Sequence, residues 1–268
     1  MKNQVILNAD DFGWTDGHNL AVEQAHRQGV LHRASLMCTG EAFFEAVEIA
    51  RRLPKLSIGV HLTLNEGFPL INSKHLPNIT NQAGMFYDEV VDLALLWLRG
   101  KLYSDEVALE WSAQLERALE AGTTLSHLDS HKHVHLLPPL LETIIHLAQK
   151  LQINYIRLPL EREFTHTLRR GFPGILLWLL ARRARVKLRQ AGMNFADHFI
   201  GIGHSGEMTA ARLQAALSRS RDGLTEIMMH PAVITSAVMR LKKRYHWAAR
   251  YHFEEELEAL CSLRPGEI

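Results

Sequence analysis

Four histidines and one aspartate fall within nine residues in the middle of the chain, from His127 to His135. Imidazole is the commonest protein ligand for divalent metal ions, and a nearby carboxylate can bind the metal or orient a ligand. Side chains alternate between faces in a strand, so His127, Asp129 and His131 would share one face. We therefore interpret this segment as part of a metal site. The alternative is a run of surface histidines or an artificial tag, but the run is interrupted by apolar residues and leads into Leu136-Leu137-Pro138-Pro139, typical of a helix approach.

Further polar residues stand at the carboxyl ends of predicted strands. They are Asp10 and Asp11 after the first strand, His61 at the third, Asp129 and His131 at the fourth, Arg157 on the fifth and His230 at the seventh. Taken singly, each residue has a structural explanation, such as a helix cap, a satisfied buried histidine or a salt-bridge partner. Their joint placement on one rim is harder to explain by packing and favours a metal-centred active site.

The adjacent carboxylates Asp10 and Asp11 allow two chemical tasks to be divided. Neighbouring side chains of an extended chain point in opposite directions, so one carboxylate can bind a cation while the other faces a reacting water. A divalent ion polarises a carbonyl and lowers the pKa of bound water from about 16 toward about 7, and a carboxylate can then accept its proton. A histidine on the other side, such as His230, can protonate a leaving amine.

Short apolar runs alternate with longer amphipathic stretches and must position these residues. The candidate strands cover residues 5–8, 34–38, 57–62, 124–129, 155–158, 198–202 and 225–230, and the candidate helices cover 19–28, 41–53, 104–121, 140–151, 174–190, 210–218 and 253–260. This alternation predicts an α/β protein with a parallel sheet, and seven strands predict a closed or nearly closed barrel. An open doubly wound sheet is the alternative. Residues 66–86, rich in Asn, Pro and Gly, are predicted to form a long loop over the barrel mouth.

Composition argues against several classes of protein. The 268 residues contain 30 Lys and Arg against 29 Asp and Glu, so no overall charge favours nucleic acid. Cys38 and Cys261 lie far apart, which argues against a disulfide framework and for a reducing compartment. The N-terminal apolar run is too short for a signal peptide, and no apolar stretch approaches the roughly 20 residues that span a bilayer, so we expect a cytoplasmic protein. No glycine-rich fingerprint follows the first strand, which argues against a nucleotide cofactor.

Four separated blocks resemble the signature of a known family, the YdjC-like carbohydrate deacetylases, which include the chitooligosaccharide deacetylases. The blocks are Asn8 to Gly13, Gly59 to Leu62, Thr124 to His135 and His230 to Ala232, in the expected order. The resemblance extends from end to end. It implies a single domain over residues 1–268, a distorted (β/α) TIM-like barrel of about seven parallel strands, and removal of an acetyl group from an N-acetylglucosamine-type sugar.

The same resemblance implies roles for individual residues. It implies a divalent metal held by Asp11, His61 and His131, with Asp10 as the base and His230 as the acid, while His127, Asp129, His133, His135 and Arg157 would orient these groups or line the substrate groove. The family's metal is usually described as magnesium. Two imidazoles and one carboxylate would equally suit zinc or another transition ion, so the identity of the metal stays open.

Two features bear on the substrate. Arg157-Leu158-Pro159 and the blocks Asp197 to Gly201 and Ser205 to Thr209 look more like the hopanoid-biosynthesis-associated branch, which implies a sugar on a hopanoid glycolipid. The stretch from Phe172 to Arg189 joins an apolar half to a strongly basic half. This composition suits an interfacial membrane helix, but we favour an ordinary barrel helix with solvated basic residues. Peripheral contact with the inner membrane face and a homodimer stay open.

Two rival functions remain. The same ligand set can serve metal-dependent hydrolysis of a phosphate ester or another amide, and release of phosphate instead of acetate would identify it. In a non-catalytic metal-binding or sugar-binding module, Asp10 and His230 would have no role in proton transfer, and binding would occur without turnover.

Overall fold

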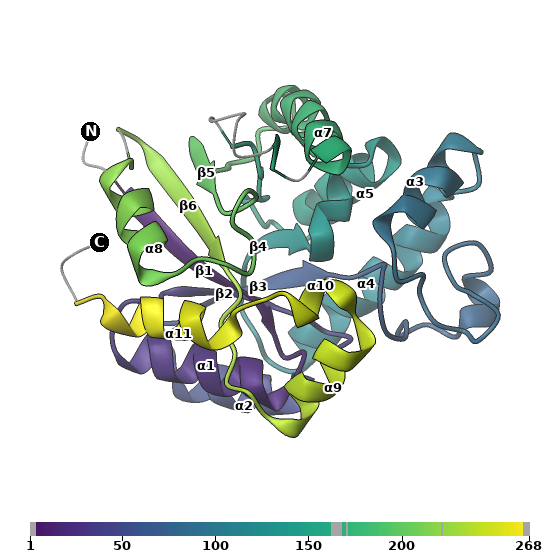
Figure 1. Ribbon diagram of the computed structural model, residues 1–268. Coiled ribbons are helices and arrows are strands. Elements are labelled where there is room, and N and C mark those ends of the chain that lie inside the picture. Colours follow the sequence, from purple (N-terminus) through teal and green to yellow (C-terminus); the bar gives the residue numbers. More distant parts are fainter. Residues whose placement is uncertain (1–3, 162–167, 170, 221, 265–268) are drawn as a thin grey trace.

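One parallel sheet forms the centre of the computed structural model, which describes residues 4–161, 168–169, 171–220 and 222–264 (Figure 1). Within these ranges the sheet has six strands in the order β4-β3-β2-β1-β6-β5. The strands are β1 (Gln4–Phe12), β2 (Arg33–Leu36), β3 (Ser57–Leu62), β4 (Leu125–Ser130), β5 (His198–Ile200) and β6 (Leu224–Met229). Because all neighbouring strands are parallel, their carboxyl ends meet at one edge of the sheet.

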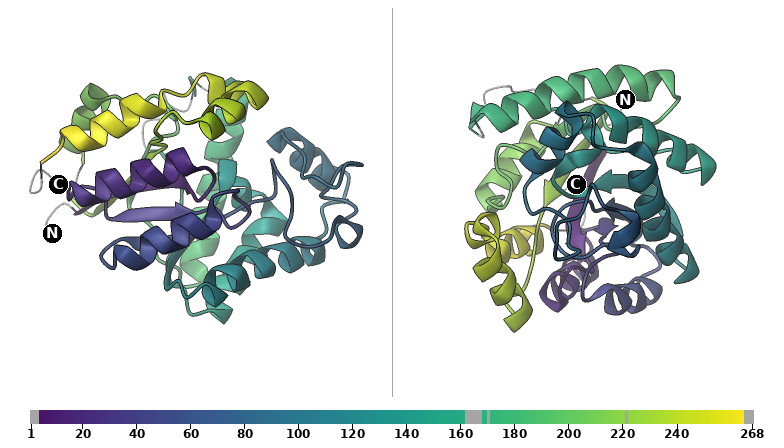
Figure 2. Two further views of the ribbon diagram at one scale, coloured as in Figure 1. Left: turned by 90° about the horizontal axis from the view of Figure 1, so that it is seen from below. Right: turned by 90° about the vertical axis from the view of Figure 1, so that its right-hand side faces the viewer.

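Helices cover the outside of the curled sheet (Figure 2). They are α1 (Asp16–Arg27), α2 (Phe43–Arg52), α3 (Val90–Leu98), α4 (Ser104–Glu120), α5 (Pro138–Lys150), α7 (Gly171–Gln190), α8 (Ala210–Ser218), α9 (Ser236–Arg244), α10 (His246–Ala249) and α11 (Phe253–Ser262), with short 3₁₀ helices η1 (Ser73–His75) and η2 (His131–Leu136). The helices α8, α11, α1 and α2 pack side by side in that order, as do α4, α5 and α7. No described helix combines the length and apolar composition that crossing a bilayer requires.

The sheet curls into a half-barrel of six strands, so the predicted count of seven is not confirmed. Residues Tyr155–Leu158 were predicted to be the fifth strand, but they form only isolated bridges, among them one between Ile156 and Leu128 of β4. The backbone of Leu128 bonds to Tyr155 and Arg157 at 3.0 Å each. The ladder cannot continue because Pro159 lacks an N–H group. The segment still lies against β4, which brings Arg157 to the interior of the curled sheet.

The segment between β3 and α3 is irregular, as predicted, apart from the single turn of η1. It packs against the protein through Leu76, Ile79 and Phe86, which are buried. The helix that follows, α3, was not predicted because its sequence, VVDLALLWL, is apolar on nearly every side and lacks an amphipathic period. The loop and α3 stand over the carboxyl edge of the sheet, on the right in Figure 1.

Candidate metal centre and active site

Asp11, His61 and His131 come together at the carboxyl edge of the sheet. One possible ligand atom from each lies within 4.8 Å of the other two. Asp11 Oδ1 is 3.5 Å from His61 Nε2 and 3.1 Å from His131 Nδ1. The second oxygen of Asp11 is buried and has no hydrogen-bond partner among the described residues. A buried oxygen without a partner is unfavourable, and a cation would satisfy it. This buried group therefore fits a divalent metal ion.

Asp10 and Asp11 both line the same cavity, which corrects the prediction that they point in opposite directions. That prediction assumed a regular strand. The register of β1 against β2 instead shifts between Ala9 and Phe12, and Asp11 has a φ of +65°. Such a bulge breaks the alternation of side chains and turns one residue toward a new direction. A positive φ is uncommon in residues other than glycine and often marks a functional site.

Each histidine of the cluster has a carboxylate on its second ring nitrogen. His61 Nδ1 donates to Asp129 Oδ1 at 2.7 Å, and His131 Nε2 lies 3.0 Å from Glu66 Oε2. These contacts leave His61 Nε2 and His131 Nδ1 directed at Asp11. Carboxylates in this position fix the orientation of metal-binding imidazoles.

The charges of the cluster favour a cation. Burial opposes a proton on His131, but the carboxylates of Asp11 and Glu66 outweigh it and raise its pKa to about 9. Burial likewise opposes the charged form of Asp11, yet His131 and His61 lower its pKa below the usual range. A metal ion would replace the proton on His131, because histidine binds metals in its neutral form.

Glu66 was not predicted as a site residue. It begins the predicted loop, has a φ of +66° and is buried. Trp247 Nε1 donates to its Oε1 at 2.6 Å, and Lys132 Nζ does so at 2.5 Å. The sequence shows only a carboxylate at the start of a loop. Its role could not be predicted, because its partners His131 and Trp247 lie 65 and 181 residues away along the chain.

Asp10 is held by Arg157, whose guanidinium donates to both carboxylate oxygens at 2.7 Å. Arg157 also contacts Asp129 at 2.9 Å and Glu226 at 2.7 Å. Its side chain is fully buried and does not line the cavity. Burial alone would favour loss of its proton, but the three carboxylates raise the pKa of Arg157 well above its usual value. These contacts suit a residue that orients Asp10 and Asp129 better than one that binds substrate.

His127 lies behind the cluster and is fully buried. Arg33 Nε donates to His127 Nδ1 at 2.9 Å, so the proton lies on Nε2, which donates to Ser35 Oγ at 3.1 Å. Ser35 Oγ in turn donates to Asp129 Oδ2 at 2.7 Å. His127 and Asp129 therefore face the same side, as predicted, and a chain of hydrogen bonds runs from Arg33 to the partner of His61. His131 lies beyond the last residue of β4 and belongs to η2.

The histidines of η2 point into different surroundings because Lys132 and His133 have φ values of +51° and +57°. His135 Nε2 donates to the carbonyl of Arg157 at 3.0 Å, and His135 Nδ1 accepts from Ser130 Oγ at 2.7 Å. Both ring nitrogens are thus satisfied in the neutral form, and burial lowers the pKa of His135 to about 4. His133 instead lines the cavity, and its buried Nδ1 has no hydrogen-bond partner among the described residues.

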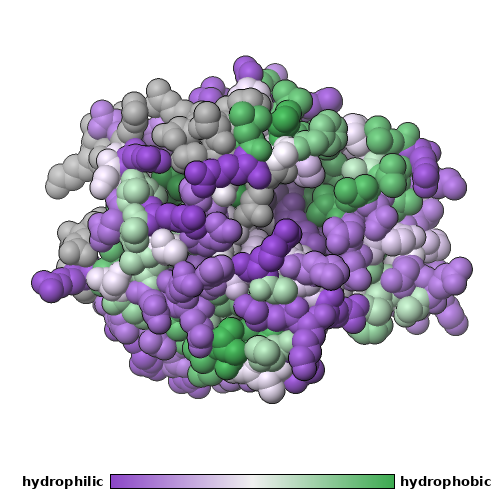
Figure 3. Space-filling view, in the orientation of Figure 1, coloured by the Kyte–Doolittle hydropathy of each residue, from purple (hydrophilic) through white to green (hydrophobic). Residues whose placement is uncertain are grey.

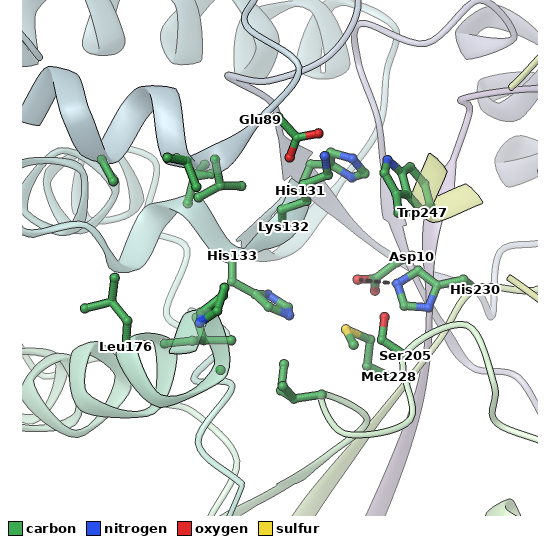
Figure 4. A pocket seen from close by; sticks show the side chains of 18 of the residues that line it. Asp10, Glu89, His131, Lys132, His133, Leu176, Ser205, Met228, His230 and Trp247 are labelled. Atoms are coloured by element: carbon green, nitrogen blue, oxygen red, sulfur yellow. Dashed lines mark ion pairs between the residues drawn. The ribbon is translucent and has the colours of Figure 1, made fainter. Parts of the chain in front are cut away.

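His230 follows β6 and lies beside Asp10 at the edge of the cavity (Figure 4). Its Nε2 lies 4.0 Å from Asp10 Oδ2. On its other side, the backbone N–H of His230 donates to Glu256 Oε2, and His230 Nδ1 is 4.0 Å from the same oxygen. Burial raises the pKa of Glu256, although His230 acts in the opposite direction. Glu256 was also missed from the sequence, because it belongs to α11, an amphipathic helix in which it resembles any other glutamate.

The candidate site opens into one cavity of about 500 Å³, which lies in the usual range for small-molecule sites. Its polar end contains Asp10, Asp11, His61, His131 and His230. Trp247 and Tyr251 form an aromatic wall beside them, with ring centroids 4.8 Å apart. Figure 3 shows the hollow on this face of the molecule, with hydrophobic residues gathered over α7 and α3 on either side.

The model of the family described as YdjC-like protein matches residues 4–267. The chain belongs to this family. A carbohydrate deacetylase of Halalkalibacterium halodurans is 32% identical over 245 residues, which cover 90% of each chain. A carbohydrate deacetylase of Thermoanaerobacter pseudethanolicus is 26% identical over 257 residues, covering 95% of this chain and 88% of the other. Among solved structures, an Enterococcus faecalis protein described as a candidate for cellobiose-phosphate cleavage superposes with a TM-score of 0.79 at 26% identity. That match covers 100% of this chain and 94% of the other.

Proposed function

We propose that the protein removes the acetyl group from an N-acetylglucosamine-type sugar in a metal-dependent hydrolysis. Its curated relatives are carbohydrate deacetylases, which act on carbon–nitrogen bonds, and this chain is a hydrolase of the same kind. One observation carries the assignment of the reaction to this cavity. Asp10 and His230 face each other beside the buried group Asp11, His61 and His131.

A divalent ion held by Asp11, His61 and His131 would polarise the amide carbonyl and lower the pKa of a water molecule. Asp10, whose two oxygens Arg157 holds in place, is positioned to accept the proton of the attacking water. His230, whose Nε2 lies 4.0 Å from Asp10 Oδ2, is positioned to give a proton to the leaving amine. One water is consumed, the amide bond breaks, and acetate and a free amino sugar leave.

The donor set suits more than one metal. Magnesium is what the family resemblance favours, and we keep it as the proposal. Two imidazole nitrogens and one carboxylate equally suit zinc or another transition ion, for which imidazole is a common ligand. Metal analysis of the purified protein decides between them.

We further propose that the sugar is carried on a hopanoid glycolipid and that residues 1–268 act as one domain. The support for the lipid comes from the branch resemblance in Arg157-Leu158-Pro159 and in residues 197–201 and 205–209. Peripheral contact with the inner face of the membrane would use the outer side of α7. There Leu179 and Val186 are 53% and 56% exposed, and Arg182, Arg183 and Arg185 are also exposed. Lys187 is paired with Glu142 and is less available to lipid.

Acetate release from soluble N-acetylglucosaminides tests the reaction. We expect release by the protein as purified, loss after chelation, and recovery when a divalent metal is returned. Release of phosphate from a sugar phosphate in place of acetate would favour the rival hydrolase, and metal binding without any turnover would favour the non-catalytic module.

Addition of anionic vesicles, with and without the change of Arg182, Arg183 and Arg185 to Gln, tests the membrane contact. The mass of the protein in solution tests the homodimer.

A further inference from the structure

The cavity has two chemically different ends. The polar end holds the proposed metal ligands, and the other end runs between α3 and α7. Its walls there are Val90, Val91 and Ala94 of α3 and Leu176, Leu177 and Leu180 of α7. Figure 4 shows Leu176 on the far side of His133 from Asp10 and His230. The apolar arm, defined by these six residues, is therefore continuous with the site of reaction but lies away from it.

A sugar ring is a poor occupant of the apolar arm. Its hydroxyl groups would lose water there, and aliphatic side chains offer no hydrogen bonds in return. The polar and aromatic end suits the sugar better, because Trp247 and Tyr251 offer faces on which a ring can pack. An apolar group joined to the sugar would instead gain free energy by leaving water for the arm.

The leucines in the apolar half of α7 fall into two groups, one that lines the cavity and one that faces solvent. Leu176, Leu177 and Leu180 line the cavity, whereas Leu179, on the same helix, does not and is 53% exposed. The apolar half of α7 thus presents part of its surface to the interior of the protein. A lipid that merely anchored the substrate in a membrane would need no such internal surface.

We infer that the apolar arm binds the aglycone of the substrate, so that the protein takes the first apolar atoms of a lipid-linked N-acetylated sugar out of the membrane and into its own cavity. This inference rests on the proposed function, but it concerns a different part of the cavity. It makes simple alkyl N-acetylglucosaminides good substrates in the absence of any membrane.

The test uses the whole metal-loaded protein and a series of alkyl N-acetylglucosaminides from methyl to octyl, each below its micelle concentration and without lipid. Each methylene that enters the arm should raise kcat/KM about three- to fourfold, until the arm is filled. Calorimetry with the same series measures the dissociation constant, which should fall by a similar factor with each methylene whether or not acetate is released.

Two leucines of α7 provide a matched pair of variants. Leu176 is half-buried and lines the cavity, while Leu177 and Leu180 also pack against the hydrophobic core, so Leu176→Asn spares those core contacts. Leu176→Asn should remove about tenfold or more of the preference for the octyl over the methyl glycoside and leave the methyl glycoside nearly unchanged. Leu179→Asn, outside the cavity, should leave the whole series unchanged.

A series in which neither kcat/KM nor the dissociation constant depends on chain length would overturn the inference and leave the proposed deacetylation standing. So would equal effects of the two variants, or a free chitooligosaccharide that binds better than the octyl glycoside. Absence of acetate from every glycoside would instead contradict the proposed function, and the calorimetric series would still decide the role of the arm.

Discussion

The guanidinium of Arg157 binds both carboxylate oxygens of Asp10, each at 2.7 Å, from a position that is itself fully buried. The same guanidinium contacts Asp129, the partner of His61. One side chain therefore links the proposed base to a proposed metal ligand. A change at Arg157 should affect both.

Arg157→Lys should lower kcat about 10- to 100-fold, with KM changed much less. Lysine keeps the charge but cannot hold two oxygens in one plane, so Asp10 loses its fixed orientation. The measurement is steady-state acetate release, with circular dichroism as the check on folding. A folded variant with nearly native kcat would show that Asp10 needs no such support.

Glu66→Gln should weaken metal binding about 10- to 100-fold, because His131 loses the carboxylate that orients it. Calorimetric titration of the metal-free protein with magnesium or zinc measures the effect. Glu48→Gln, on the exposed side of α2, is the control and should bind metal like the parent. Unchanged affinity in Glu66→Gln would exclude Glu66 from the support of the site.

Gly59→Ala should destabilise the protein by about 1–3 kcal/mol, because a Cβ atom at this position would lie 2.3 Å from the ring of His127. Urea unfolding measures the loss. In a His127→Ala background the ring is gone, so the added change Gly59→Ala should cost much less. If the two changes prove additive, crowding between Gly59 and His127 is not the cause.

Stability should fall as the pH drops from about 6.5 to about 4. Burial lowers the pKa of His18 from 6.5 to about 4, so over this range the unfolded chain binds a proton that the folded protein does not. The stabilisation is complete above the unfolded pKa and declines below it. His18→Gln should flatten the dependence of the free energy of unfolding on pH, measured in urea with chelator present. An equally steep dependence in that variant would assign it to other groups.

The strands and their common edge could be predicted from the sequence, because a short apolar run indicates a strand that is buried in the sheet. The proximity of Asp11, His61 and His131 followed from that edge and from the family resemblance. The bulge at Asp11 could not be predicted, since it arises from the pairing of β1 with β2. The roles of Glu66 and Glu256 could not be predicted for a related reason. Each acts through partners that are distant in the sequence, and only folding brings them together.

At Tyr155–Leu158 the sequence predicted more regular structure than the protein has. The short apolar run predicted a strand, but the segment forms only isolated bridges, because Pro159 has no N–H group with which to continue the pairing. The composition of this short segment therefore predicted correctly that it is buried. It did not predict that its backbone would form only isolated bridges instead of a continuous ladder.

The role of Asp10 is the central claim, and acetate release by Asp10→Asn, with metal content measured on the same sample, tests it most directly. Asparagine keeps the shape of the side chain but cannot accept a proton. We expect full metal occupancy, little change in KM for an N-acetylglucosaminide, and a fall in kcat of about 10² to 10⁴. A metal-loaded Asp10→Asn protein that releases acetate at nearly the parental rate would contradict the account.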